Sequence, residues 1–149
     1  MNFEECLNKK YLFDTKAKDP YKAMEILVLA EHKLAFLEEV SGKAEKYPSL
    51  FIEGYYEILK ELGVAILAFD GWITENHDCL FQYLQQKKEL ELDWEYLAEW
   101  RKLRNQIDYR GTKISYTLWR ENHLKIKMMI DYLCHYLKEK LKEGKYEHH

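Results

Sequence analysis

The sequence predicts an all-α protein, an up-and-down bundle of four main helices with short additional helices. Apolar residues recur at helical spacing along most of the 149-residue chain, and no segment shows sustained strand alternation. With only 6 Gly and 2 Pro, the chain has little material for turns. Its 47% hydrophobic content is enough for one core, so we expect residues 1–149 to form a single domain.

The first long helix follows a short N-terminal one. Asp19 and Pro20 form a helix start signal of the N-cap and N1 type. We expect the helix to run to about Lys46, before Tyr47 and Pro48 stop it. One face carries Leu27, Ala30, Leu34 and Leu37.

The second long helix is predicted from Ser49 to Phe69, ended by Asp70 and Gly71. Gly54 and Gly63 lie inside it, where each costs about 1 kcal/mol relative to alanine. We therefore expect neighbouring helices to pack closely against both glycines. The apolar stripe of this helix consists of Tyr55, Ile58, Leu62, Ala65, Ile66 and Phe69.

Three further helices are predicted in the second half of the chain. Thr74 is a plausible N-cap for a shorter helix that ends at the QQKK segment, residues 85–88. The next helix runs from Asp93 to about Arg110 and ends at Gly111, and the last runs from about Ser115 to Glu143. Their apolar faces carry Leu80, Tyr83 and Leu84; then Tyr96, Leu97, Trp100, Leu103 and Ile107; then Leu118, Ile126, Met129, Leu133, Leu137 and Leu141.

Several classes of protein are excluded by what the sequence lacks. No apolar run approaches the ~20 residues of a membrane span, and the acidic, polar N-terminus differs from a signal peptide, so we expect a cytoplasmic protein. Residues 144–149, which end in EHH, are expected to be a disordered tail or an affinity-tag remnant.

Metal and disulfide chemistry is not indicated either. Cys6, Cys79 and Cys134 are far apart and odd in number, so we expect three buried thiols rather than a disulfide framework or a CxxC motif. No histidine pair has HxH or HxxxH spacing, and we expect no metal and no cofactor. The histidines considered are His32, His77, His123 and His135.

Charge is polarised along one predicted helix. The net charge of -3 argues against a globally basic nucleic-acid binder. However, residues 89–100 hold five acids and no base, whereas residues 101–113 hold five bases and one acid. This polarity also complements a helix dipole, so charge alone does not establish a site.

A polar strip borders the apolar face at the end of that helix, made of Arg101, Arg104, Asn105, Asp108 and Tyr109. One interpretation is structural: Arg104 and Asp108 form an i,i+4 pair, Asn105 bonds a loop backbone, and Tyr109 packs its ring. The other is functional, because a guanidinium offers a planar fork to phosphate, while asparagine and tyrosine can orient a sugar or phosphate oxygen.

The segment RKLRNQIDYRG, residues 101–111, followed by one long terminal helix, resembles the signature of the HEPN superfamily, named for nucleotide binding in higher eukaryotes and prokaryotes. Residues 53–84 are similar to the central helix pair of that superfamily, with two tyrosines near the start, a DG turn and a histidine that opens the next helix. The resemblance covers roughly residues 20–140.

The resemblance implies a four-helix bundle that dimerises through its motif-bearing helices. In many members the dimer interface forms a metal-independent endoribonuclease, and toxin members often pair with a nucleotidyltransferase-type antitoxin. Their motif is an arginine, four to six residues, then a histidine, with a polar residue commonly after the arginine. Arg104 and Asn105 match its first two positions, whereas Tyr109 stands where the shortest version has histidine.

That departure bears on activity. Histidine titrates near ~6.5 and tyrosine near ~10, so Tyr109 is a poor general base at neutral pH. Tyr109 could still donate a hydrogen bond to phosphate while Arg104 stabilises developing charge, with slower or absent cleavage. His77 could take the role of the missing histidine only if folding brings it close; otherwise, beside Asp78 at a helix start, it caps or packs.

Three functional hypotheses follow. The first is a HEPN-type homodimer that acts on RNA or a nucleotide, with Arg101, Arg104 and Arg110 as phosphate contacts, Asn105 as an orienting residue and Tyr109 as proton donor or placeholder. The second is a catalytically inactive bundle that serves as a structural or regulatory interaction module, in which Arg104 and Asp108 pair. The third is a ligand-binding bundle with an aromatic cage made of Tyr55, Tyr56, Trp72, Tyr83, Trp94 and Trp100, residues that fill the core in the alternative interpretation.

Overall fold

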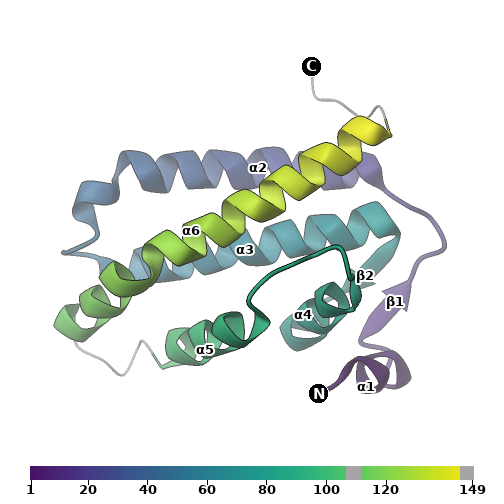
Figure 1. Cartoon of the computed structure of the whole chain (residues 1–149), viewed down its shortest axis with the longest axis horizontal. Coiled ribbons are helices and arrows are strands. Elements are labelled where there is room, and N and C mark those ends of the chain that lie inside the picture. Colours follow the sequence, from purple (N-terminus) through teal and green to yellow (C-terminus); the bar gives the residue numbers. More distant parts are fainter. Residues whose placement is uncertain (107–111, 145–149) are drawn as a thin grey trace.

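A computed structural model describes residues 1–106 and 112–144, without the side chains of residues 112–114. The described chain is mostly helical, which confirms the all-α prediction at this level, and it adds a small two-stranded sheet (Figure 1). In chain order the elements are α1 (Phe3–Asn8), β1 (Leu12–Asp14), α2 (Pro20–Glu39), the 3-10 turn η1 (Ser41–Lys43), α3 (Pro48–Asp70), β2 (Trp72–Thr74), α4 (His77–Gln86), α5 (Trp94–Asn105) and α6 (Thr112–Glu143).

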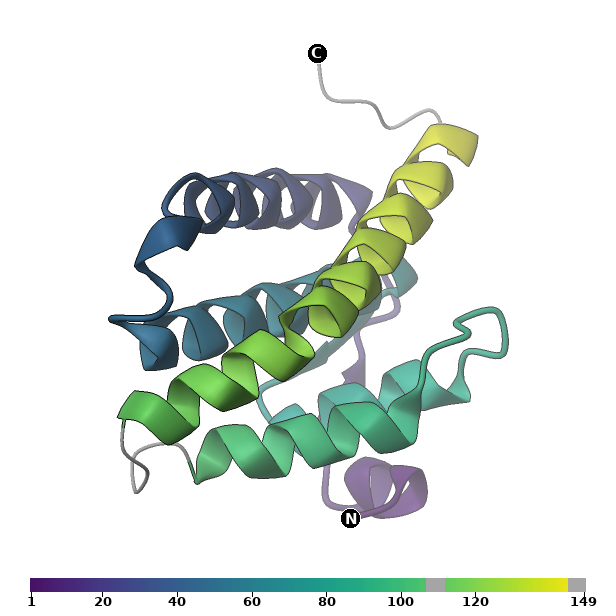
Figure 2. The ribbon, with the colours of Figure 1, turned by 60° about the vertical axis from the view of Figure 1, so that its left-hand side comes forward.

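Helix α3 lies at the centre of the packing. It contacts α2 and α6 along much of its length, and it also contacts α4 and β2 (Figures 1 and 2). The predicted apolar stripe is buried as expected, with Phe69 packed partly buried at its end. The side chains buried along α3 include Tyr55, Ile58, Leu59, Leu62, Ala65 and Ile66.

The two glycines inside α3 are close-packing positions, as predicted. A Cβ built on Gly54 would lie 2.8 Å from Cδ1 of Leu37 on α2. On Gly63 it would lie 3.1 Å from Cδ1 of Leu84 and 3.3 Å from Leu80, both on α4. Each glycine therefore allows one neighbouring helix to approach.

Most predicted helix ends are close to the observed ones. Asp19 caps α2, and its Oδ1 accepts a hydrogen bond from the Lys22 backbone N–H at 3.1 Å. Gly71 ends α3 in the left-handed conformation, with φ of 86°. Helix α2 ends at Glu39 rather than near Lys46, because the chain tightens into the 3-10 turn η1.

The region between α3 and α4 differs from the prediction. Thr74 ends strand β2, and Asn76 is the N-cap of α4, where its Oδ1 accepts a hydrogen bond from the Cys79 backbone N–H at 3.0 Å. Strands β1 and β2 pair antiparallel, with Phe13 opposite Ile73. Three residues per strand are too few for alternation to stand out in the sequence, so this ribbon was not predicted.

Helix α5 begins after the predicted cap Asp93, whose Oδ1 accepts a hydrogen bond from the Tyr96 backbone N–H at 3.0 Å. Leu97 and Trp100 are buried beneath it. Helix α5 ends at Asn105, with Gln106 as its C-cap, rather than near Arg110 as predicted. Residues 107–111 lie outside the described residues; they include the predicted core residue Ile107, the predicted helix end Gly111, and three candidate site residues, Asp108, Tyr109 and Arg110.

The prediction of three free thiols is wrong. Cys6 on α1 and Cys79 on α4 form a disulfide, with Cα atoms 5.7 Å apart. The two cysteines are 73 residues apart in sequence, and only the tertiary fold brings them together. Cys134 is a buried free thiol, as expected, and burial raises its pKa to about 11.

Along the described part of the chain, none of the helices has both the length and the apolar character that crossing a bilayer requires.

Candidate functional site

An open groove of about 440 Å³ lies where the start of α4, the end of α5 and one face of α3 meet. It is a polar hollow on the surface rather than an enclosed cavity. The residues that line it are Tyr56 from α3, Glu75, Asn76, His77 and Asp78 around the start of α4, and Arg101, Arg104 and Asn105 from α5.

Arg104 is oriented by three neighbours. Its Nε and Nη2 donate to Oε2 of Glu53 at 3.2 and 2.9 Å, and its Nη1 donates to Oδ1 of Asn105 at 3.0 Å. The guanidinium carbon lies 4.3 Å from the centroid of the Tyr56 ring. The Arg104 side chain keeps 24% of its surface exposed. The predicted pairing with Asp108 falls outside the described residues; within them, Arg104 contacts the carboxylate of Glu53 on α3.

Arg101 lies one turn earlier on α5 and faces α4. Its Nη2 forms an ion pair with Oδ1 of Asp78, and its guanidinium carbon lies 4.5 Å from the Phe81 ring centroid. Its buried Nε has no hydrogen-bond partner among the described residues. A buried donor without a partner is unfavourable, and this atom is closed to solvent, so the exposed part of the guanidinium is the part that faces the groove.

His77 is the first residue of α4 and shares the groove with Arg104. Its Nδ1 lies 3.4 Å from the Tyr56 hydroxyl. The pKa of His77 is lowered below its ordinary value of 6.5, first by burial and then by the charge of Lys60, with smaller contributions from Arg101 and Arg104; Glu57 opposes the shift. The imidazole is therefore neutral at pH 7 and able to accept a proton.

Folding thus brings together four of the seven candidate residues: His77, Arg101, Arg104 and Asn105. Asp108, Tyr109 and Arg110 lie outside the described residues. Three partners were missed by the sequence reasoning, namely Glu53, Tyr56 and Asn76. Glu53 and Tyr56 precede Arg104 by about fifty residues, and only the tyrosine pair at 55–56 had drawn attention in the sequence.

Three carboxylates stand against two guanidinium groups at the groove, and two of the three are paired with an arginine. Glu53 lies beside Arg104, Asp78 lies beside Arg101, and Glu75 stands on the rim. Within the described residues, no three His, Cys, Asp or Glu side chains are grouped as metal ligands would be. Chemically, the groove offers two oriented guanidinium groups, two carboxamides, a phenol and a neutral imidazole, beside the carboxylates of Glu75 and Asp78.

The aromatic residues considered for a ligand cage are used in packing. Tyr55, Tyr83 and Trp100 belong to the buried core, Tyr56 is buried beneath Arg104, and Trp72 and Trp94 pack against the core partly buried. Their positions agree with the core-filling interpretation.

Comparison of the chain with protein-family models, with curated protein sequences and with solved structures finds no match.

Proposed function

We propose that this chain is a HEPN-type protein, a homodimer of up-and-down four-helix bundles that binds RNA or a nucleotide in the groove between α3, α4 and α5. One observation carries the proposal. The arginines and asparagine of the motif-like segment, Arg101, Arg104 and Asn105, open into the same groove as His77.

Phosphate recognition follows from the way Arg104 is held. A guanidinium binds phosphate best when its planar fork is already oriented, because less side-chain entropy is lost on binding. Glu53 and Tyr56 fix the plane of Arg104, while part of the side chain remains exposed. Arg101 supplies a second guanidinium one turn away, held by its ion pair with Asp78.

His77 gives the groove a proton acceptor that does not depend on Tyr109. In the proposed reaction the neutral imidazole takes the proton of a ribose 2′-hydroxyl, whose oxygen attacks the adjacent phosphorus. The bond from phosphorus to the 5′-oxygen breaks, and water protonates the leaving oxygen. Arg104 stabilises the negative charge that develops on the phosphoryl oxygens.

The second candidate function is an interaction module without ligand. The observation that favours it is the contact of Arg104 with Glu53 inside one chain. In this interpretation the pair fixes α5 against α3, and the groove residues contribute to stability or to dimer contacts only.

Substitution of Arg104 tests the proposal. We expect Arg104→Ala to weaken binding of a labelled single-stranded RNA of about ten nucleotides by roughly tenfold or more, because one charge-assisted contact to phosphate is lost. The slope of log K against log salt should fall by about 0.7. Lys102→Ala removes the same charge from the exposed surface of the same helix and should change the affinity less than twofold. Fluorescence anisotropy at several salt concentrations measures both.

A double-mutant cycle with Glu53→Gln separates the two candidate functions. If the groove binds phosphate, Glu53→Gln strengthens RNA binding, because the amide oxygen can still accept from Arg104 and keep it oriented while the negative charge that competes with phosphate is removed. If the pair is only structural, Glu53→Gln and Arg104→Ala destabilise the fold and are strongly coupled in urea unfolding, while RNA affinity is the same in all four proteins. Equal RNA affinity of wild type and Arg104→Ala would overturn the proposal.

A further inference from the structure

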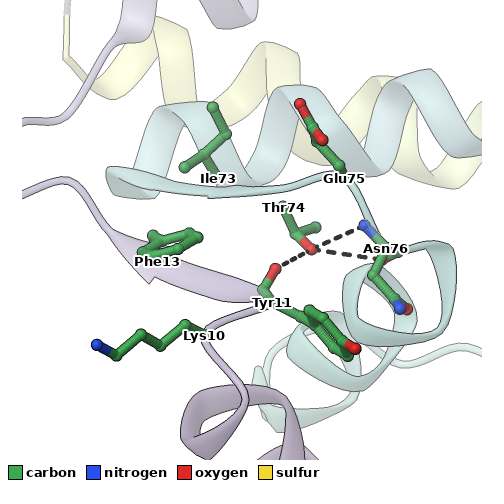
Figure 3. Close-up of a pocket in the computed structure, with 7 residues that line it drawn as sticks. All are labelled: Lys10, Tyr11, Phe13, Ile73, Thr74, Glu75 and Asn76. Atoms are coloured by element: carbon green, nitrogen blue, oxygen red, sulfur yellow. Dashed lines mark hydrogen bonds between the residues drawn. The ribbon is translucent and has the colours of Figure 1, made fainter.

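We propose that the hollow on the outer face of the β1–β2 ribbon holds a base of a single-stranded RNA whose phosphate lies in the arginine groove. This inference rests on the proposed function and adds the class of ligand, an unpaired strand rather than a duplex. The hollow has a volume of about 530 Å³ and is lined by Lys10, Tyr11, Phe13, Ile73, Thr74, Glu75 and Asn76 (Figure 3).

The floor of the hollow is an exposed apolar pair. Phe13 and Ile73 are opposite each other in the ribbon register, so both side chains stand on the same face. They keep 50% and 42% of their surface exposed, whereas Leu12, which precedes Phe13, is buried on the other face. The exposed ring of Phe13 is a surface on which a base can stack, and Ile73 extends the apolar contact beside it.

The wall of the hollow is fixed by one hydroxyl group. Thr74 Oγ1 donates a hydrogen bond to the Tyr11 carbonyl and accepts one from the Asn76 backbone N–H at 3.1 Å (Figure 3). Tyr11 adds a second exposed aromatic ring at the end of β1. Lys10 adds a positive charge at the mouth, which favours a polyanion.

The hollow and the arginine groove are neighbours on the surface. Glu75 and Asn76 line both of them, so one two-residue ridge separates Phe13 and Tyr11 from His77 and the arginines. A strand that crosses this ridge would place a base on the ribbon and a phosphate beside Arg104. Single-stranded nucleic acid is commonly bound in this way, with aromatic stacking beside a cationic groove.

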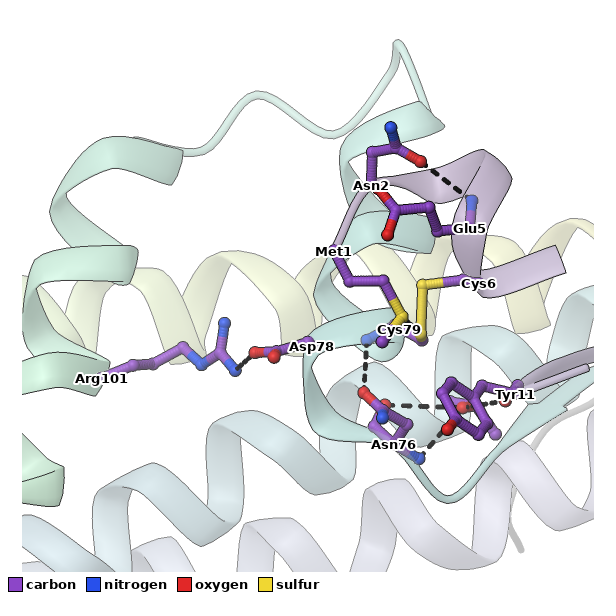
Figure 4. The surroundings of a disulfide bond; sticks show 10 residues. Met1, Asn2, Glu5, Cys6, Tyr11, Asn76, Asp78, Cys79 and Arg101 are labelled. Atoms are coloured by element: carbon purple, nitrogen blue, oxygen red, sulfur yellow. Dashed lines mark hydrogen bonds and ion pairs between the residues drawn. A yellow bond between two sulfur atoms is a disulfide. The ribbon is translucent and has the colours of Figure 1, made fainter. Parts of the chain in front are cut away.

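The disulfide joins the two walls of the hollow. The backbone N–H of Tyr11 donates to the Cys6 carbonyl at 3.0 Å, and Asn76 caps the turn that carries Cys79. The Cys6–Cys79 bond therefore links the Tyr11 side to the Asn76 side, with the Asp78–Arg101 pair next to it (Figure 4). A subsite whose walls are linked covalently loses little conformational freedom on binding.

Glu75 gives the proposal a charge signature. Its exposed carboxylate stands on the ridge and repels a phosphate that crosses it. We therefore expect Glu75→Gln to strengthen RNA binding by roughly two- to fivefold at low salt. A protein partner docked on the apolar floor would not produce this gain in RNA affinity.

The test compares a labelled oligoadenylate with an abasic strand of the same length and charge. We expect Phe13→Ala to weaken oligoadenylate binding by roughly fivefold or more and to leave binding of the abasic strand unchanged. Arg104→Ala should weaken both strands. Phe36→Ala, which truncates an exposed phenylalanine on α2, is the matched control and should alter neither. Fluorescence anisotropy gives the affinities, and sedimentation velocity gives the oligomeric state.

The outcomes distinguish a failure of the base subsite from a failure of the arginine groove. If Arg104→Ala weakens oligoadenylate binding but Phe13→Ala does not, the base subsite is wrong and the groove stands. If the wild type binds neither strand, both proposals are wrong. If Phe13→Ala dissociates a dimer while the RNA affinity per chain is unchanged, the ribbon face is a contact between copies of this chain, and the subsite is overturned.

Discussion

His77 and Arg104 are coupled through a single phenol ring. Arg104 stacks on the face of Tyr56, and the Tyr56 hydroxyl lies 3.4 Å from His77 Nδ1. The positive charges near His77 favour its neutral form, and burial acts in the same direction. Burial and the nearby Lys60, with smaller contributions from Arg101 and Arg104, thus lower the pKa of His77 and keep it unprotonated at pH 7.

The titration of His77 should show the effect of burial and of the neighbouring charges. We expect the midpoint of its NMR titration to lie below 6.5. Lys60→Gln should raise the midpoint toward 6.5, because it removes the positive charge that most disfavours protonation of His77, and because Glu57 loses its partner at 2.8 Å. The folded-state pKa is below the unfolded one, so the unfolded state binds more protons in this window. The contribution of His77 to the free energy of unfolding therefore falls as the pH drops below about 6.5, whereas above that pH it does not change. A midpoint at or above 6.5 in the wild type would contradict the lowered pKa of His77.

At the level of elements, the last turn of α3 forms a junction with the segment that connects β1 to α2. Gly71 has φ of 86°, and its carbonyl accepts hydrogen bonds from the Thr15 backbone N–H at 2.8 Å and from Thr15 Oγ1 at 2.7 Å. The Asp19 N–H also donates to the Ala68 carbonyl at 2.9 Å. The segment between β1 and α2 is therefore attached to the last turn of α3.

Substitution at this junction should be costly. We expect Gly71→Ala to lower the free energy of unfolding by about 1–3 kcal/mol, because the left-handed conformation disfavours a side chain and the new Cβ would lie 3.2 Å from the Ala17 carbonyl carbon. Gly42→Ala is the control, since nothing lies within 4 Å of its added Cβ. Urea unfolding measures both variants. Equal stability of Gly71→Ala and wild type would mean that the junction does not need this conformation.

The elements differ in how far the sequence predicts them. Helix α3 was predicted within a residue at each end, because a long apolar stripe and a DG stop agree. The ribbon was not, because three-residue strands carry no periodic signal. In the groove, the sequence predicts Arg101, Arg104 and Asn105 as site residues because they lie within one five-residue segment. Glu53 and Asn76 were not, because only the packing of α3 and α4 against α5 brings them there.

Across the whole molecule, the disulfide closes a loop of 73 residues. We expect its reduction, or Cys6→Ser with Cys79→Ser, to lower the free energy of unfolding by about 4 kcal/mol, because the unlinked unfolded chain has more conformational freedom. Urea unfolding with and without reductant measures this. In denaturant, thiol titration should give one thiol before reduction, from Cys134, and three afterwards. Three thiols without reductant would contradict the disulfide.

The residues around the groove lie partly inside and partly outside the loop that the disulfide closes. Residues 6–79 form a closed ring that contains Glu53, Asp78 and His77, whereas α5 and α6 belong to the open remainder of the chain. Both arginine pairs, Arg101 with Asp78 and Arg104 with Glu53, cross this boundary. A ligand that displaced Asp78 and Glu53 from the two guanidinium groups would therefore also remove two ion pairs that join α5 to this ring, while the buried Leu97 and Trp100 keep the helix packed.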